Sequence, residues 1–180
     1  MNEYRLQNEY SFTLRFDVSG VSLSPDALLE RLAAGGCDDA VAGVGTPGRL
    51  ALSFDREADS ATRAVTSAVH DVRAALPGAT LLAASPDVVG LTDIARLVGR
   101  SRQNMRKLLL GGRGAPAPLH EGSSAVWHLA PVLAWLCDEK AYPISDDLVE
   151  LAQTTMQLNL AVEARLVDRA LQRELRALVG

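Results

Sequence analysis

Residues 91 to 110, LTDIARLVGRSRQNMRKLLL, constrain the fold of this chain more than any other stretch. Apolar residues recur at helical spacing from Leu91 to Val98, which predicts a short helix. Gly99 predicts its end, because glycine readily takes the positive φ of a helix C-terminus. Ser101 then offers a capping oxygen to a second helix, from Arg102 to about Leu110. This order is typical of a helix-turn-helix.

The second predicted helix has an apolar side and a polar side. Met105, Leu108 and Leu109 can pack inward, and most Arg, Gln and Lys side chains fall on the other side. In a helix-turn-helix the second helix enters the DNA major groove, where Arg can contact guanine and Gln or Asn can contact adenine. The expected base contacts come from Arg102, Gln103, Asn104 and Arg106.

Positive charge is concentrated in the same segment. Six Arg and Lys side chains face a single carboxylate, Asp93, across residues 91 to 113, and Thr92 is the expected N-cap beside it. Such a cluster suits the binding of phosphates. The expected phosphate contacts are Arg96, Arg100, Lys107 and Arg113, with Ser101 holding the recognition helix in place. An ordinary helical hairpin with a solvated basic face fits the same pattern, and that alternative stays open.

The segment that follows predicts a wing and a further helix. Residues 118 to 120 and 125 to 128 are expected as strands of a hairpin, and Pro131 lies near the first turn of the next helix. The order SRQNMRKLL, a proline-bracketed loop, VWH and LAPVLAWL resembles the winged helix-turn-helix of the MerR and AlpA/excisionase group, over residues 88 to 137. The resemblance implies DNA binding in which the wing touches phosphates. The wing departs from the group's basic composition, since it carries Glu121 between His120 and His128.

The segment before residue 86 predicts a separate unit of strands and helices. Period-two alternation or short apolar runs predict strands at residues 10–18, 40–44, 50–54 and 79–84. One helix is expected to begin after its N-cap Ser24, and another to run from Ser60 to Leu76. The first helix is expected to bury Leu28, Leu29 and Leu32, and a loose polar arm is expected at residues 1–9. The order β-α-β-β-α-β is typical of a ferredoxin-like α+β sandwich. This order alone identifies no chemistry.

The last segment predicts one long helix, from Ser145 to about Leu178. A helix of about 33 residues is about 50 Å long, too long to pack wholly on the small helix-turn-helix domain. We therefore expect a homodimer through its apolar stripe, although a helix folded back on its own N-terminal domain is an alternative. The expected dimerisation residues are Leu148, Leu151, Leu158, Val162 and Leu166.

Composition limits the classes of protein that this chain can belong to. With a net charge of −4, it is not expected to coat nucleic acid indiscriminately, although a local basic cluster still permits specific binding. Cys37 and Cys137 lie far apart without metal-ligand spacing, so both are expected to be small buried residues and no cofactor or metal is predicted. No signal peptide or membrane span is predicted, which favours a cytoplasmic location.

These features predict an α+β chain of three parts: residues 1–86, 87–138 and 144–180. The first hypothesis is a sequence-specific, dimeric transcriptional regulator bound to double-stranded DNA. The second is a protein-interaction module, such as an adaptor or antitoxin-like partner, that uses the winged fold without specific DNA binding. Residues 10–84 could add binding of an unknown ligand or protein. An enzyme has the least support, because no nucleophile–base pair or metal-ligand set is visible.

Overall fold

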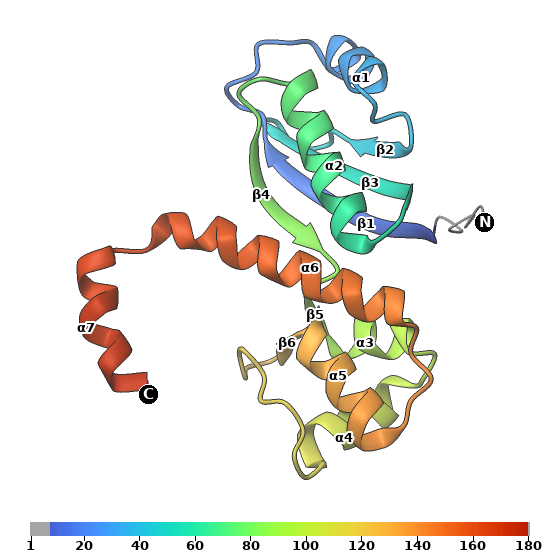
Figure 1. Ribbon diagram of the computed structural model, residues 1–180, viewed down its shortest axis with the longest axis vertical. Helices are drawn as coiled ribbons and strands as arrows, with labels where there is room; N and C mark the ends of the chain where they lie inside the picture. The colour runs from blue at the N-terminus through green and yellow to red at the C-terminus, as the bar shows by residue number, and fades with distance from the viewer. Residues whose placement is uncertain (1–7, 180) are drawn as a thin grey trace, which may run out of the picture.

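The N-terminal unit is a four-stranded antiparallel sheet with helices on one face. In the computed structural model, which describes residues 8–179, the strand order is β2-β3-β1-β4 (Figure 1). Its elements are β1 (Asn8–Asp17), α1 (Pro25–Ala34), β2 (Ala40–Gly43), β3 (Arg49–Ala58), α2 (Ala61–Ala75) and β4 (Thr80–Ser85). The expected order of strands and helices is therefore confirmed. Of the arm expected at residues 1–9, the first seven lie outside the described residues, and Asn8 and Glu9 belong to β1.

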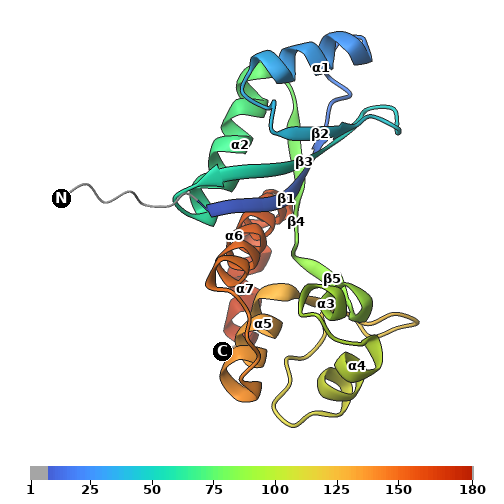
Figure 2. The same cartoon turned by 90° about the vertical axis from the view of Figure 1, so that its right-hand side faces the viewer.

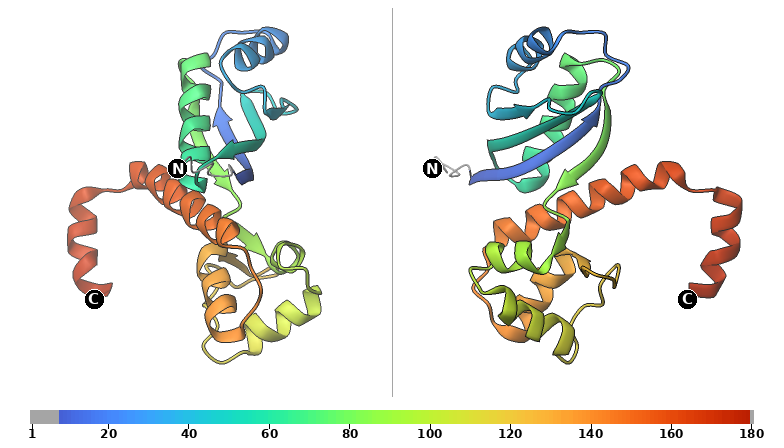
Figure 3. Two further views of the ribbon diagram at one scale, coloured as in Figure 1. Left: turned by 45° about the vertical axis from the view of Figure 1, so that its right-hand side comes forward. Right: turned by 180° about the vertical axis from the view of Figure 1, so that it is seen from behind.

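Alternation along β1 determines which face of the sheet is buried. Phe12, Leu14 and Phe16 are at most 4 % exposed, and their partners across β3 are equally buried. Phe12 stacks on Phe54 with ring centroids 5.2 Å apart. The residues between them point to the other face, which Figure 3 shows without a covering helix. One covered face and one open face are what period-two alternation produces in an antiparallel sheet.

Capping serines fix the starts of the two helices on this sheet. The Ser24 hydroxyl accepts a hydrogen bond from the backbone N–H of Ala27, and Ser60 Oγ does the same for Arg63, at 3.3 and 3.2 Å. The Ser24 cap agrees with the sequence-based expectation, whereas Ser60, expected as the first residue of its helix, is the N-cap. The expected burial of Leu29 is wrong: this side chain is 38 % exposed, because α1 buries only Leu28 and Leu32.

The second unit comprises β5 (Val88–Gly90), α3 (Leu91–Leu97), α4 (Arg102–Gly111), β6 (Val126–His128) and α5 (Leu129–Lys140). It has its own core, in which Ile94, Met105, Trp127 and Leu133 are at most 1 % exposed. It lies at the opposite end of the molecule from α1 and the sheet (Figures 1 and 2). Most of the apolar residues expected in this segment therefore form a core, whereas Leu97 is 39 % exposed.

The prediction of a single C-terminal helix from Ser145 to about Leu178 is wrong. The chain forms α6 (Asp146–Glu163), a short 3₁₀ turn η1 (Ala164–Leu166) and α7 (Arg169–Val179). Val167 takes an extended conformation with ψ 121°. Asp168 Oδ1 then accepts the backbone N–H groups of Ala170 and Leu171, at 2.8 and 3.1 Å. The break therefore starts a separately capped helix.

Helix α6 lies between the two units and packs on both. Leu151 belongs to the core of the sheet unit, and Ala152, the next residue, belongs to the core of the second unit. Polar contacts add to this: Glu150 accepts the backbone N–H groups of Ala61 and Thr62 at the start of α2, at 3.2 and 3.5 Å. Its carboxylate thus satisfies donors that every helix start leaves free. Helix α6 therefore agrees with the alternative expectation, a helix that folds back on the N-terminal domain of its own chain.

The short joint between the units is held from three sides. Asp87 is 2 % exposed, and its carboxylate accepts from the Asn159 amide at 2.7 Å and lies 2.7 Å from His128 Nδ1. Its backbone carbonyl accepts the N–H of Leu129 at 2.7 Å, and the Thr155 hydroxyl donates to the carbonyl of Pro86. A buried carboxylate is stable only with such partners. The two units are therefore joined by a packed connection.

Candidate nucleic-acid interface

The turn between α3 and α4 has the geometry that the sequence predicts. Gly99 has φ +63°, a conformation that side chains with a Cβ rarely adopt. The Ser101 hydroxyl accepts the backbone N–H of Asn104 at 3.1 Å and caps α4. The expected Thr92 cap is wrong: the N-cap of α3 is Gly90, whose backbone N–H donates to the Asp93 carboxylate at 3.2 Å. The carboxylate of Asp93, three residues after the N-cap, therefore caps α3 in place of Thr92.

The inner side of α4 is anchored in the core of the second unit. Met105 is 0 % and Leu109 4 % exposed, one turn apart on the same side of the helix. Leu108 is partly buried beside them. This anchoring fixes which side chains of α4 face outward.

Gln103 and Lys107 are exposed and lie on the side of α4 opposite Met105 and Leu109. Arg102 and Arg106, one turn apart, are exposed along one flank of that row. The expected base contacts on this helix are thus all accessible. Arg106 and Lys107 are adjacent to Gln103 at i+3 and i+4, so a partner that meets one of them meets the others.

Asn104 lies on the other flank of α4, where the structure adds a residue that the sequence analysis missed. Tyr142, in the connector between α5 and α6, donates its hydroxyl to Asn104 Oδ1 at 3.0 Å. The guanidinium of Arg100 lies over the same ring, with its central carbon 5.2 Å from the ring centroid. The aromatic face attracts the cation, so Tyr142 positions both side chains. Tyr142 follows the end of α5, and nothing in the sequence around it indicates this role.

The expected cationic phosphate contacts are exposed in the same region. Arg96, Arg100, Lys107 and Arg113 all lie on the surface. Within residues 8–179, the ion pairs involve only Arg49, Arg56 and His128, so no carboxylate neutralises this cluster. Because Asp93 is the single carboxylate of residues 91–113, the region has a net positive charge.

The expected two-stranded wing is largely wrong. Only one bridge, between His120 and Val126, remains of the hairpin, together with a 2.8 Å hydrogen bond from Leu119 N to the Val126 carbonyl. β6 instead pairs with β5, in register Val89 with Trp127. The intervening loop, which begins at Glu121, is exposed over residues 121–124. Trp127 and Trp135 are 1 % and 8 % exposed and belong to the core of the second unit.

The expected dimerisation residues lie mostly inside the chain. Leu151 is 4 % exposed, and Leu158 and Val162 pack against the core of the sheet unit. Leu148 packs against the core of the second unit, whereas Leu166 is 88 % exposed. The apolar stripe of α6 is thus covered intramolecularly, whereas Leu160 on its other side and Leu166 beyond its end are exposed.

A buried cation, Arg56, lies outside this region, in the sheet unit. Its guanidinium forms a forked pair with Asp39, at 2.7 and 3.0 Å, and a 2.7 Å bond with Asp71. Burial lowers the pKa of Arg56, but the hydrogen bonds that its guanidinium donates to these carboxylates outweigh burial and raise the pKa above its ordinary value. The cluster ties β3 to α2 and to the loop before β2, which indicates a structural role.

Residues 8–179 contain no group of three or more His, Cys, Asp or Glu side chains placed to hold a metal ion. Over the same range, every helix is too short or too polar to cross a bilayer. Comparison of the chain with models of protein families, with curated proteins and with solved structures finds no match.

Proposed function

We propose that this protein binds double-stranded DNA in a sequence-specific manner and acts as a dimeric transcriptional regulator. In this proposal α3 and α4 form a helix-turn-helix with a reduced wing, and α4 enters the major groove. The sheet unit is a ferredoxin-like support. The observation that carries the proposal is the outer face of α4, where Arg102, Gln103, Arg106 and Lys107 are exposed on a helix fixed from behind.

Each exposed group of α4 matches a chemical feature of DNA. Arg102 and Arg106 have the planar fork that pairs with guanine, and Gln103 has the amide that pairs with adenine. Arg96, Arg100, Lys107 and Arg113 supply charge for phosphates around that contact. Asn104 shares its side-chain oxygen with Tyr142, which leaves its amide N–H group as a donor. No catalytic step is part of this proposal.

A protein-interaction module is the second candidate, because one observation favours it. From Gly114 to Glu139 the chain contains no Lys or Arg, so the wing loop lacks the charge that contacts phosphates in a basic wing. Glu121 is exposed in that loop. A partner protein with its own basic surface could meet this loop and the α5 end of the unit.

Selection from a random duplex-DNA library, followed by fluorescence anisotropy across salt concentrations, separates the two candidates. For a DNA reader we expect one enriched motif and an affinity that falls steeply with salt. Arg102→Ala should change the preferred sequence and weaken the best site by about 1–3 kcal/mol. Lys107→Ala should weaken all sequences similarly and reduce the salt slope.

The matched control is Arg73→Ala, which removes an exposed Arg from α2 in the sheet unit and should leave both motif and affinity unchanged. Failure to enrich any sequence with folded protein would contradict the DNA-binding proposal. Equal loss of affinity for every sequence with Arg102→Ala would contradict a base-reading role for that residue.

A further inference from the structure

The open face of the sheet contains a pocket, far from α3 and α4. The pocket has a volume of about 590 Å³, within the range of about 300–1,000 Å³ that is typical of small-molecule sites. Residues of β1, β3 and β4 line it, together with the end of β2 and the loop that follows. Figure 3 shows from behind that no helix lies over this face. A small molecule therefore has access to the pocket.

The strand register places apolar surface beside one cation in this pocket. Ala51 lies opposite Arg15 on β3, and Ala83 lies opposite Arg15 on β4. The register of β4 shifts at this point, so Leu82 has no partner on β1. A bulge of this kind redirects a side chain, and Leu82, 38 % exposed, lines the pocket together with Ala83. The aliphatic surface of the pocket thus begins next to the Arg15 guanidinium.

Two arginines line the pocket, and only Arg49 has an anionic partner. Arg49 Nη1 donates to Asp17 Oδ2 at 3.2 Å, and Asp17 Oδ1 accepts from the N–H and the hydroxyl of Ser19, at 2.9 and 2.6 Å. Arg15 forms no ion pair with any of residues 8–179. It is a diagonal neighbour of Arg49, because its partner Ala51 follows Arg49 by two residues. Such neighbours are about 7–8 Å apart, so both guanidinium groups can reach one anion.

The local charge favours an anion with a single charge. Two arginines against Asp17 leave an excess of one positive charge. A carboxylate balances this excess and matches the planar fork of an arginine, whereas a phosphate monoester carries about −1.5 to −2 at pH 7. The opposite end of the same face exposes three carboxylates: Glu9, Asp55 and Glu57. An anion is therefore attracted to the arginine end of the sheet and repelled from the other end.

The loop beside the pocket is held in place by backbone contacts. The Arg49 N–H donates to the Thr46 carbonyl at 3.0 Å, and Gly48 has φ +72° after Pro47, as in a type II turn. The Val18 N–H donates to the Gly48 carbonyl at 2.9 Å and joins the turn to the end of β1. Thr46 and Arg49, which both line the pocket, are thus fixed at the two ends of one turn. A preformed site loses little conformational entropy when a ligand binds.

We propose that this pocket binds a small molecule with one carboxylate and an apolar body. Arg15 donates hydrogen bonds to the carboxylate, Arg49 adds positive charge, and the body packs on Ala51, Ala83 and Leu82. Such a site, mostly apolar with a few polar groups that orient the ligand, has the composition of small-molecule sites in general. This binding function goes beyond the proposed reading of DNA and does not depend on it.

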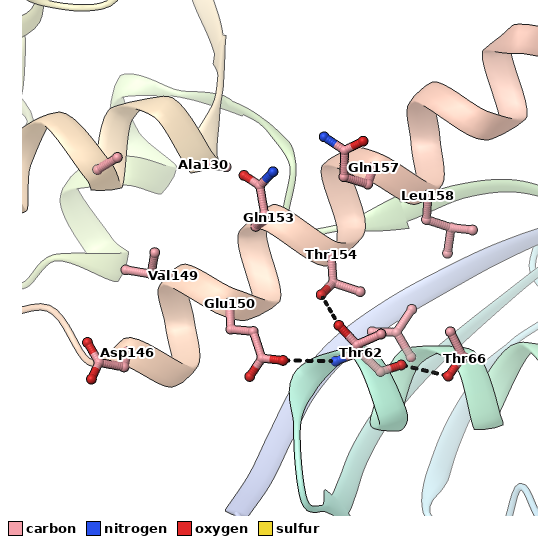
Figure 4. A pocket seen from close by; sticks show the side chains of 12 residues that line it. Thr62, Thr66, Ala130, Asp146, Val149, Glu150, Gln153, Thr154, Gln157 and Leu158 are labelled. Carbon is pink, nitrogen blue, oxygen red and sulfur yellow. Dashed lines mark hydrogen bonds between the residues drawn. The ribbon is translucent and has the colours of Figure 1, made fainter.

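The larger groove between α2, α5 and α6 is unsuited to the same ligand. This groove has a volume of about 690 Å³, and its charged lining residues are the acids Asp146 and Glu150. Figure 4 shows the Glu150 carboxylate turned toward the start of α2, where it accepts the backbone N–H of Thr62 at 3.5 Å. Because both charges repel a carboxylate, the groove is an internal reference for the location of binding.

The first test is a titration of the isotope-labelled full chain, without DNA, followed by the chemical shifts of its backbone amides. Hexanoate and benzoate should cause saturable shifts at Thr46, Ala51 and Leu82, and none at Gln153 or Gln157 in the groove. Hexanamide and benzamide keep the apolar body and lack the charge, so they should bind at least about tenfold more weakly. Acetate keeps the charge and lacks most of the body, so it should also bind at least about tenfold more weakly than hexanoate.

The second test repeats the hexanoate titration with substituted chains. Arg15→Gln should weaken binding by about tenfold or more, because it removes the charged donor. Ala51→Leu should abolish binding, because the larger side chain fills the pocket from β3. The matched controls are Arg73→Gln on α2 and Ser11→Leu, on the same face of β1 and outside the pocket. Both should leave the affinity for hexanoate unchanged.

Several results would overturn the proposal. Equal affinities for hexanoate and hexanamide would remove the role of the arginines, and inorganic phosphate that binds as tightly as hexanoate would exclude recognition of an apolar body. Shifts confined to the groove would assign the ligand to another site, and no saturable shift with any carboxylate would exclude the site altogether. Because these titrations contain no DNA, a failed ligand site and a failed DNA selection are separate results.

Discussion

Asn159 in α6 pairs through both ends of its side-chain amide with the backbone of Ala84 in β4. Its Oδ1 accepts the Ala84 N–H at 2.7 Å, and its Nδ2 donates to the Ala84 carbonyl at 2.8 Å. β4 is an edge strand, and unpaired backbone groups on such a strand can pair with another chain. Asn159 therefore satisfies part of this edge while its Nδ2 also reaches Asp87.

Replacing Asn159 should destabilise the whole molecule. Asn159→Ala removes the three contacts and leaves buried polar groups of Ala84 and Asp87 without these partners, which should cost about 2–4 kcal/mol. Urea unfolding measures the free energy. Leu160→Ala, at the next and 42 % exposed position, is the control and should change stability by less than about 1 kcal/mol. Equal effects would mean that the amide contacts contribute little.

Replacing Arg56 should be more costly, because the cation is buried between Asp39 and Asp71. Arg56→Ala should lower stability by about 3–5 kcal/mol, since it leaves both carboxylates without their shared partner. Arg56→Lys keeps the charge without the forked geometry and should recover only part of this loss. Thermal or urea unfolding measures both, with Arg73→Ala as an exposed control. Full recovery with lysine would show that charge alone matters.

The thiol of Cys37 should make stability fall in alkaline solution. Burial, followed by the charge of Asp71, raises the pKa of Cys37 from 9.0 to about 11. The unfolded chain loses this proton near pH 9 and the folded chain does not, so the contribution is constant below pH 9 and is lost between about 9 and 11. The measurement is the difference in unfolding free energy between the natural chain and Cys37→Ala as a function of pH. A constant difference across that range would contradict the prediction.

Tyr142 should act as a positioning residue for α4 in the proposed DNA reader. Tyr142→Phe removes the hydroxyl bonded to Asn104 and keeps the ring beside Arg100. We expect little change in stability, because the hydrogen bond that is lost is exposed, and a loss of about 1 kcal/mol in affinity for the preferred DNA site. Fluorescence anisotropy measures the affinity. Tyr10→Phe removes a hydroxyl bonded to Asp147, far from α4, and should leave affinity unchanged.

Local signals in the sequence were sufficient for most element boundaries. Ser24, Ser101 and Ser145 each cap the helix that they were expected to start, and Gly99 has the expected positive φ. Each of these depends on the backbone within a few residues, and therefore on chemistry that neighbours in sequence supply. The outward side of α4 followed in the same way from Met105 and Leu109.

The parts that were wrong depend on distant partners. Helical periodicity in α6 indicates an apolar face but does not indicate what covers it. In the structure this face is covered by two cores of the same chain. β6 pairs with β5, about 38 residues earlier, in preference to its neighbour at 118–120. One missed boundary had a local signal: Asp168 is a good N-cap residue, and it starts α7.

The position of α6 makes the order of synthesis important. A ribosome completes α2 and β4 well before it adds residues 146 to 163. Until then, the Ala84 backbone groups that Asn159 later binds are unpaired, and the first amides of α2 lack the Glu150 carboxylate. During that interval the sheet is open to pairing with the same strand of a neighbouring nascent chain. Emergence of α6 ends the interval, because this helix pairs with the edge strand and packs on the second unit at the same time.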